Sequence, residues 1–299
     1  MSNRSLVLLF MTSLLAACSS GSSPSSVSRP SPTPLAIIVP FTVDPTDSHA
    51  LIMIIANGLS MKADLDTGAQ VDVIDASLAR SMNLQVRQTE PLITPYGLQR
   101  GERLSEPLKI ALDGFTMTDN MVLIQDKNMH RPGEQNFIPT DMTIGAPVFK
   151  DRVITFDYKR HVFKLGPLGL RLSCPRDALF SGRATFNHAL PIVQASVNGD
   201  RGGLMLDTGS GEAFSVYNAG IAGFGLQQES KLELANQRHQ FWVGTDKSIS
   251  LGRFKVLPDV YFIRQNAPSG IYGRVGAPSF ALSGATLSID YKTGITCIN

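Results

Sequence analysis

The chain has little net charge, few cysteines and, beyond its first residues, no long apolar run. Its 27 Lys and Arg residues nearly balance 25 Asp and Glu residues, which leaves a formal net charge of +2, and the basic residues form no run. Binding to nucleic acid depends on a basic patch or stripe, so we expect no nucleic-acid partner. Past the N-terminus, no apolar stretch approaches the roughly 20 residues that a membrane-spanning helix needs.

Motifs for metals and cofactors are also missing. The five histidines have no paired spacing typical of zinc ligands. The segment Thr208-Gly209-Ser210-Gly211 lacks the Gly-x-Ser-x-Gly register of a nucleophile elbow, and the chain has no Gly-rich phosphate cradle. We therefore expect neither a metal nor a cofactor.

The first 17 residues are typical of an export signal. A basic start at residues 1–4 is followed by an apolar run at 6–15 and by the small residues Ala16 and Ala17. This run is too short to span a membrane. Residues 18–34 are almost entirely Ser, Pro and Gly, cannot bury enough apolar area to fold, and are predicted to be a tether.

Cys18 follows directly on Ala17. This arrangement resembles the bacterial lipoprotein signal, in which the cysteine is lipidated and becomes the mature N-terminus. An ordinary signal peptide with an incidental cysteine is the alternative. Because Ser19 rather than Asp follows the cysteine, the resemblance implies a lipid-anchored protein of the cell envelope, sorted to the outer membrane and facing the periplasm of a Gram-negative cell.

The body of the chain contains an internal duplication. Leu65-Asp66-Thr67-Gly68-Ala69 recurs as Leu206-Asp207-Thr208-Gly209-Ser210. Three further landmarks recur in the same order, namely Asn57-Gly58 with Asn198-Gly199, Ile144-Gly145-Ala146-Pro147 with Val275-Gly276-Ala277-Pro278, and Asp157-Tyr158-Lys159 with Asp290-Tyr291-Lys292. The body therefore reads as two homologous halves.

Both halves have the texture of β-structure. Short runs rich in Val, Ile, Leu and Phe are bounded by Gly, Pro, Asn and Asp, which is typical of strands. One helix is predicted at residues 75–82. We predict an all-β, bilobal fold with one barrel-like lobe at 35–166, an inter-lobe linker at 167–187 and a second lobe at 188–299.

Two cysteines lie in the body, Cys174 and Cys297. An exported compartment permits a disulfide between them, which would join the inter-lobe segment to the last strand. Two unpaired thiols are the alternative.

If the two halves face each other, Asp66 and Asp207 meet. Two carboxylates a few ångström apart cannot both ionise cheaply and share a proton, as in the aspartic-protease dyad that is the standard example. One carboxylate can then act as general base on a water while its protonated partner polarises or protonates an amide. The titration belongs to the pair.

Here the chain resembles the aspartic proteases of the retropepsin/pepsin type, most of all bacterial relatives with two tandem retropepsin-like repeats. The likeness covers nearly the whole body. It implies that Asp66 and Asp207 are the catalytic dyad and that Thr67, Gly68, Thr208, Gly209 and Ser210 support it. It also implies that segments 143–145 and 274–276 pack against these loops.

The resemblance has two departures. Family members usually carry Ser or Thr after both Gly residues, where the hydroxyl bonds the carboxylate, but the first copy has Ala69. We expect an ionised Asp66 to be the less stabilised of the pair, so that Ala69→Ser lowers the pH optimum. The second departure is the flap, for which Tyr96 and Trp242 are the candidates. An ordinary surface turn with a packed aromatic is the alternative at each.

The sequence thus predicts a monomeric, membrane-tethered aspartic endopeptidase that cleaves peptide or protein substrates. A non-catalytic envelope lipoprotein that binds peptides or acts as a scaffold is the alternative. Of the remaining acids, Asp157 and Asp290 are interpreted as structural, and Asp64 and Asp72 as solvated or locally paired.

Overall fold

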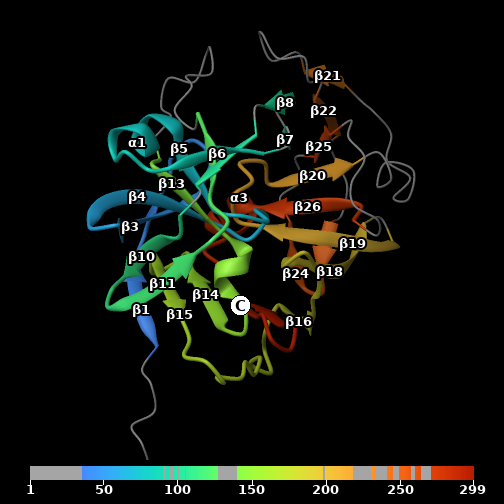
Figure 1. Ribbon diagram of the computed structural model, residues 1–299. Helices are drawn as coiled ribbons and strands as arrows, with labels where there is room; N and C mark the ends of the chain where they lie inside the picture. The colour runs from blue at the N-terminus through green and yellow to red at the C-terminus, as the bar shows by residue number, and fades with distance from the viewer. Residues whose placement is uncertain are drawn as a thin grey trace, which may run out of the picture. The chain divides into compact units, whose positions relative to one another are not determined.

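Figure 1 is a ribbon diagram of the computed structural model of the chain. The structure describes residues 36–89, 92–94, 97–99, 101–104, 106–126, 140–197, 199–217, 230–232, 241–244, 249–256, 260–263 and 271–299. Residues from Leu35 to the C-terminus form one compact unit. Strands dominate the described part, where the helices are short, so the all-β class is confirmed.

The first half of the body forms a ten-stranded sheet with the order β11-β10-β3-β4-β13-β5-β12-β9-β6, and β2 pairs with β3. Its strands are β2 (Thr42–Val43), β3 (Ala50–Ala56), β4 (Leu59–Asp66), β5 (Val73–Asp75), β6 (Val86–Gln88), β9 (Glu102–Leu104), β10 (Leu108–Leu112), β11 (Phe115–Asp119), β12 (Leu123–Gln125) and β13 (Met142–Gly145). β7 (Leu92–Thr94) and β8 (Gly97–Gln99) form a separate two-stranded sheet.

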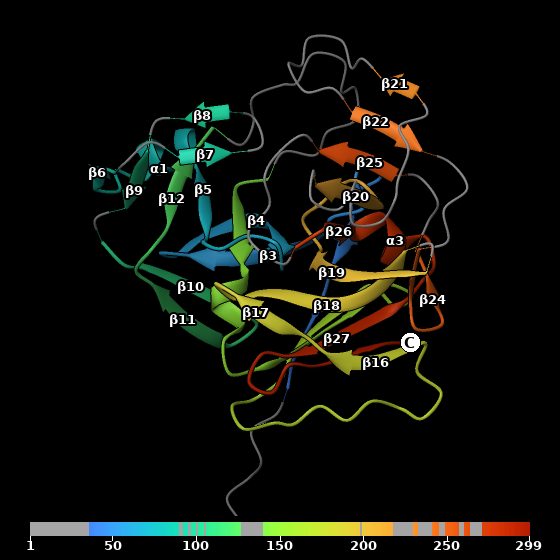
Figure 2. The same ribbon diagram turned by 90° about the vertical axis from the view of Figure 1, so that its right-hand side faces the viewer.

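The second half forms another ten-stranded sheet, with the order β21-β22-β25-β20-β26-β19-β18-β23-β24 and with β17 paired to β18. Its strands are β17 (Thr185–Asn187), β18 (Leu190–Val197), β19 (Asp200–Asp207), β20 (Phe214–Tyr217), β21 (Ser230–Leu232), β22 (Phe241–Gly244), β23 (Ile249–Leu251), β24 (Phe254–Lys255), β25 (Val260–Ile263) and β26 (Gly273–Gly276). Figure 2 shows β20, β26, β19 and β18 following one another.

The two ten-stranded sheets repeat the same topology. β4 pairs in parallel with β13, which is antiparallel to β5, which is parallel to β12. In the second half β19, β26, β20 and β25 pair in the same order and with the same directions. The duplication that the sequence predicts therefore extends to strand order.

A six-stranded sheet takes strands from both halves, in the order β1-β15-β14-β27-β28-β16. Its strands are β1 (Ile37–Pro40), β14 (Val153–Asp157), β15 (Val162–Leu165), β16 (Phe180–Arg183), β27 (Thr286–Asp290) and β28 (Ile295–Ile298). Within the segment predicted as a linker, residues 180–187 instead form β16 and β17, because β28 and β18 offer them strand edges to pair with.

The helices sit where the strands turn. α1 (Ala76–Ser81) lies within the predicted 75–82, and Asp75 caps it by accepting hydrogen bonds from the amides of Ser77 and Leu78. α3 (Ala277–Ala281) and the 3-10 helix η1 (Ala146–Phe149) follow the two Gly-Ala-Pro landmarks, with Pro in their first turn.

Cys174 and Cys297 form a disulfide with a Cα–Cα distance of 5.5 Å. Cys297 lies on β28 and is fully buried. The bridge therefore joins the segment before β16 to the shared six-stranded sheet.

Removing this bridge is expected to destabilise the body. Crosslinking residues 123 apart restricts the unfolded chain, so the Cys174→Ser/Cys297→Ser variant should lose about 3 kcal/mol of unfolding free energy. Urea unfolding of the variant and of the native chain measures this, with reductant-treated native chain as the control. Equal midpoints in all three samples would contradict the expectation.

Candidate active site

Both Asp-Thr-Gly motifs begin at the end of a buried strand. β4 ends at Asp66 and β19 ends at Asp207. In the parallel pairing with the neighbouring strands, Gly145 lies opposite Asp66 and Gly276 lies opposite Asp207. The two aspartates thus occupy equivalent positions in the two sheets.

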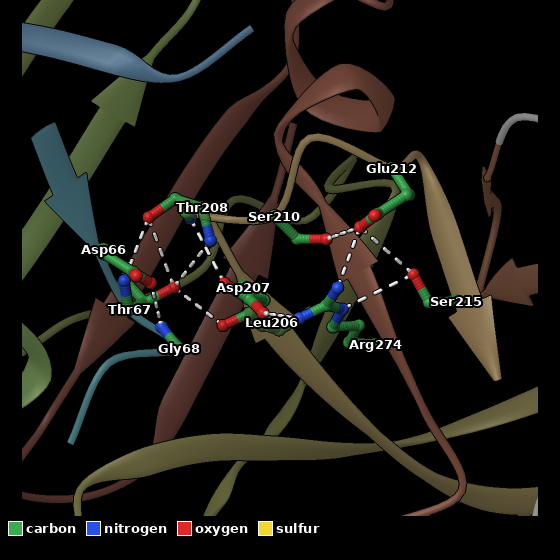
Figure 3. Close-up of polar contacts among 11 residues, drawn as sticks. Asp66, Thr67, Gly68, Leu206, Asp207, Thr208, Ser210, Glu212, Ser215 and Arg274 are labelled. Atoms are coloured by element: carbon green, nitrogen blue, oxygen red, sulfur yellow. Dashed lines mark hydrogen bonds and ion pairs between the residues drawn. The ribbon is translucent and has the colours of Figure 1, made fainter. Parts of the chain in front are cut away.

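The two threonines lock the motifs together by reciprocal hydrogen bonds (Figure 3). The amide of Thr67 donates to Oγ1 of Thr208 over 3.0 Å, and the amide of Thr208 donates to Oγ1 of Thr67 over 3.0 Å. Each hydroxyl then donates to a carbonyl of the opposite strand, Thr67 to Leu206 at 2.7 Å and Thr208 to Leu65 at 2.8 Å. Both threonines are fully buried, so these bonds fix the two turns to each other away from water.

The motif glycines let the carboxylates approach. Each aspartate accepts a hydrogen bond from the amide of the Gly two residues later, Asp66 from Gly68 at 2.7 Å and Asp207 from Gly209 at 3.2 Å. A Cβ atom on Gly68 would overlap the carboxyl of Asp207, and one on Gly209 would overlap that of Asp66. Any larger residue at either position would push the carboxylates out of place.

Asp66 and Asp207 interact strongly as a pair. Burial and the charge of Asp207 raise the pKa of Asp66 well above its usual range, and a hydrogen bond to Asp207 adds to the rise. Asp66 keeps some solvent access, whereas Asp207 is 4% exposed. This pair can hold one proton between two carboxyl groups.

The Gly-Ala landmarks support the motifs as the resemblance implies. The amide of Ala146 donates to the carbonyl of Ala69 at 2.9 Å, and that of Ala277 donates to the carbonyl of Ser210 at 3.0 Å. A Cβ atom on Gly145 would lie 2.7 Å from the backbone carbonyl oxygen of Val71, so this close packing requires glycine.

Arg274 is one of two site residues that sequence reasoning missed; the other is Glu212. Its Nη1 lies 3.3 Å from Oδ2 of Asp207, and its Nη2 lies 2.8 Å from Oε2 of Glu212 (Figure 3). Burial by itself lowers the pKa of Arg274, but the two carboxylates outweigh it and raise the pKa above its usual value. The available signal was that Arg274 directly precedes the landmark Val275-Gly276-Ala277-Pro278.

Glu212 completes this cluster. Burial favours its neutral form, but the Arg274 guanidinium and the Ser210 hydroxyl hold the pKa of Glu212 below its usual value. The Ser210 hydroxyl donates to Oε2 of Glu212 at 2.7 Å.

The hydroxyl of Ser210 therefore donates to Glu212 and not to the Asp207 carboxylate, which differs from the contact that the resemblance implies. The expectation for Ala69→Ser loses its structural basis with it. The dyad is still asymmetric, and Arg274 supplies the asymmetry.

The structure corrects the interpretation of Asp64 and Asp72 as solvated or locally paired acids. Both are buried rather than solvated, at 6% and 1% exposed. Asp64 accepts a hydrogen bond from the Thr143 hydroxyl at 2.9 Å, and Asp72 accepts one from the amide of Gly145 at 2.7 Å. These partners lie far along the chain and reach the acids through β13.

Asp157 and Asp290 organise the turns that follow β14 and β27. Asp157 accepts from the amide of Arg160 at 3.0 Å, and Asp290 accepts from the amides of Lys292 at 2.9 Å and Thr293 at 3.1 Å. These contacts fit the structural role that the sequence indicates.

Tyr96 and Cys18 lie outside the described residues. Trp242 lies on β22, where its backbone pairs with Lys231 of β21. Both flap assignments and the Cys18 anchor remain predictions.

No protein-family model matches the chain, and no curated protein is significantly similar to it. In the described part of the chain, no group of three or more His, Cys, Asp or Glu side chains is arranged to hold a metal ion. Among the same residues, no helix has both the length and the apolar character to cross a membrane.

Proposed function

We propose that this protein is an aspartic endopeptidase with Asp66 and Asp207 as its catalytic dyad and with a two-lobed, retropepsin/pepsin-like fold. The observation that carries the proposal is the reciprocal Thr67–Thr208 lock, which holds two equivalent Asp-Thr-Gly turns against each other. A structural acid pair has no need of such mutual support, whereas a proton-sharing dyad requires a fixed separation.

The chemistry follows from a dyad that carries one proton. The ionised carboxylate takes a proton from a water whose oxygen attacks the peptide carbonyl carbon, while the protonated carboxyl gives its proton to the carbonyl oxygen. The first step yields a geminal diol. In the second step the amide nitrogen takes the proton from the carboxyl that had accepted it from water, and the C–N bond breaks. A hydroxyl proton of the diol passes to the carboxylate that had protonated the carbonyl oxygen. Water is consumed and the dyad ends with one proton.

The substrates proposed are peptide or protein segments in extended form, bound by a monomer. The same proposal puts this activity at the outer membrane, which the export signal and Cys18 support, with residues 18–34 as the tether. Tyr96 and Trp242 remain the candidates for flaps that cover the peptide.

The alternative is a lipoprotein that binds peptides without cleaving them, and one observation favours it. Arg274 forms an ion pair with Asp207, which stabilises the charged carboxylate and opposes its protonation. If this pairing held both carboxylates in the ionised form, the dyad would bind but not hydrolyse. The raised pKa of Asp66 argues for a retained proton and therefore for catalysis.

Incubation of the full chain with a peptide library separates these functions. Cleavage mapped by mass spectrometry across pH 3 to pH 8, with inhibition by a statine-type transition-state mimic, is expected for the peptidase. Saturable peptide binding with no cleavage product at any pH supports the binding protein instead.

A further inference from the structure

The Asp-Thr-Gly turns repeat closely, but the strands that flank them do not. Thr143 of β13 lies opposite Asp64 in the first sheet, and Arg274 of β26 lies opposite Met205 in the second. The hydroxyl of Thr143 bonds Asp64, whereas the guanidinium of Arg274 reaches Asp207 itself. A neutral group and a cation therefore occupy equivalent positions beside the two halves of the dyad.

The Arg274 side chain is held firmly in this place. Besides Asp207, it contacts Glu212 through Nη2 at 2.8 Å and the Ser215 hydroxyl through Nε at 3.4 Å. It is 17% exposed, so solvent screens its charge only weakly. The cation is thus directed at one carboxylate of the pair and not at the other.

We propose that Arg274 is a positioning residue that breaks the symmetry of the dyad: it keeps Asp207 as the carboxylate and leaves the shared proton on Asp66. On the proposed function, on which this assignment rests, Asp207 is then the general base that activates water and Asp66 is the acid that protonates the carbonyl oxygen. The raised pKa of Asp66 agrees with a shared proton that stays on Asp66.

Asp64 adds to this asymmetry, whereas the other titratable groups around the dyad do not provide it. The charge of Asp64, two residues before Asp66 on β4, also raises the pKa of Asp66. Burial raises the pKa of Tyr217, at the end of β20, and the pKa of Tyr291, directly after β27, so both tyrosines stay neutral. Glu212 is itself paired with Arg274.

The segment between β2 and β3 brings one more pair to the site. A Cβ atom on Gly211 would lie 2.8 Å from Cβ of Asp47, and Asp47 lies 3.4 Å from His49. Burial raises the pKa of Asp47, and the charge of His49 opposes this rise. Of this pair Asp47 lies beside Gly211, in the turn after Asp207, whereas Arg274 contacts the Asp207 carboxylate itself.

The test follows the carboxyl ¹³C signals of Asp66 and Asp207 through a pH titration of the full chain in detergent, labelled at aspartate. Asp66→Asn and Asp207→Asn assign the signals. In the native chain the Asp207 signal should reach its carboxylate position at a pH at least about one unit below that of Asp66.

Substitution of Arg274 and substitution of Glu212 should shift the pH of the Asp207 step in opposite directions. Arg274→Met removes the cation and should move the Asp207 step up by about one pH unit or more. Glu212→Gln removes a competing anion and should move it down. Arg274→Lys keeps the positive charge and should preserve most of the native pH difference between the Asp66 and Asp207 steps. A purely structural role of Arg274 would not require this result.

Because Arg274→Met leaves Glu212 unpaired, the Arg274→Met/Glu212→Gln double variant is the fallback if the single variant fails to fold. Its Asp207 step is compared with that of Glu212→Gln alone and should lie at higher pH. Thr143→Val, at the equivalent position, is the matched control and should leave the Asp207 step in place. The proposal is overturned if the Asp207 step stays in place in Arg274→Met and also in the double variant relative to Glu212→Gln. Loss of the Asp66 proton first in the native chain overturns it as well.

The signals report proton positions without substrate, so the two proposals fail separately. An Arg274-dependent order of titration in a chain that cleaves no peptide retains this inference and removes the peptidase. Peptide cleavage by a chain whose order of titration does not depend on Arg274 retains the peptidase and removes this inference.

Discussion

Replacement of Asp66 or of Asp207 by asparagine is expected to abolish peptide hydrolysis. Each substitution removes a group that must gain and lose a proton, and general acid–base catalysis contributes about 10²- to 10⁴-fold to rate. Since the dyad acts as a unit, we expect each single variant to lose about 10³-fold or more in kcat/KM, and the double variant to lose little beyond that. Initial rates on a peptide that the native chain cleaves measure the effect.

The two variants should differ in stability. The raised pKa of Asp66 means that the folded chain binds this proton more tightly than the unfolded chain does. The contribution of Asp66 to stability is therefore complete below the ordinary pKa of an aspartate and falls as pH rises from there through the raised pKa of the folded chain. Asp66→Asn removes that loss and should be at least as stable as the native chain at pH 7. Asp207→Asn breaks the ion pair with Arg274 and should be less stable.

Thermal unfolding of both variants at pH 4 and pH 7 provides the control for folding. A folded Asp66→Asn chain that retains full activity would sink the dyad assignment. Equal losses of stability in both variants at pH 7 would contradict the asymmetry.

Removal of the threonine hydroxyls is expected to have the largest effect on stability. Thr67→Val deletes the hydrogen bonds of a fully buried hydroxyl and leaves the Leu206 carbonyl and the Thr208 amide without these partners. Each unsatisfied buried group costs about 1 to 3 kcal/mol. We expect about 3 kcal/mol of lost unfolding free energy for Thr67→Val, and about 5 kcal/mol when Thr208→Val is added.

The matched control keeps the hydroxyl. Thr67→Ser retains both hydrogen bonds and loses only one buried methyl group, so it should cost about 1 kcal/mol. Urea unfolding of the full chain compares the variants. A Thr67→Val chain no less stable than Thr67→Ser would mean that the reciprocal bonds do not hold the two turns together.

The strand-rich character of the chain and its duplication were accessible from the sequence because they depend on local pattern. Alternating apolar runs with turn residues between them specify strands, and matched landmarks in two halves specify matched topology. The meeting of Asp66 with Asp207 follows from that repetition. The cap of α1 at Asp75 is equally local, since a carboxylate before a helix finds its partners two and three residues later.

What surrounds the carboxylates depended on contacts between distant segments. Arg274 meets Asp207 across 67 residues because β26 pairs in parallel with β19, and neither strand alone specifies which side chain will face the acid. Asp64 meets Thr143 across 79 residues, so its burial was invisible in a local window. The strands in 180–187 likewise exist because β28 and β18 present free edges there.

By itself the sequence determined the class of fold, the duplication and the two acids, since these rest on short-range periodicity and on a motif that occurs twice. The tertiary structure alone decided that a cation contacts one acid and not the other. Strand register determines which residue of β26 lies close enough to Asp207 to form an ion pair. Register matters because electrostatic energy falls steeply with distance.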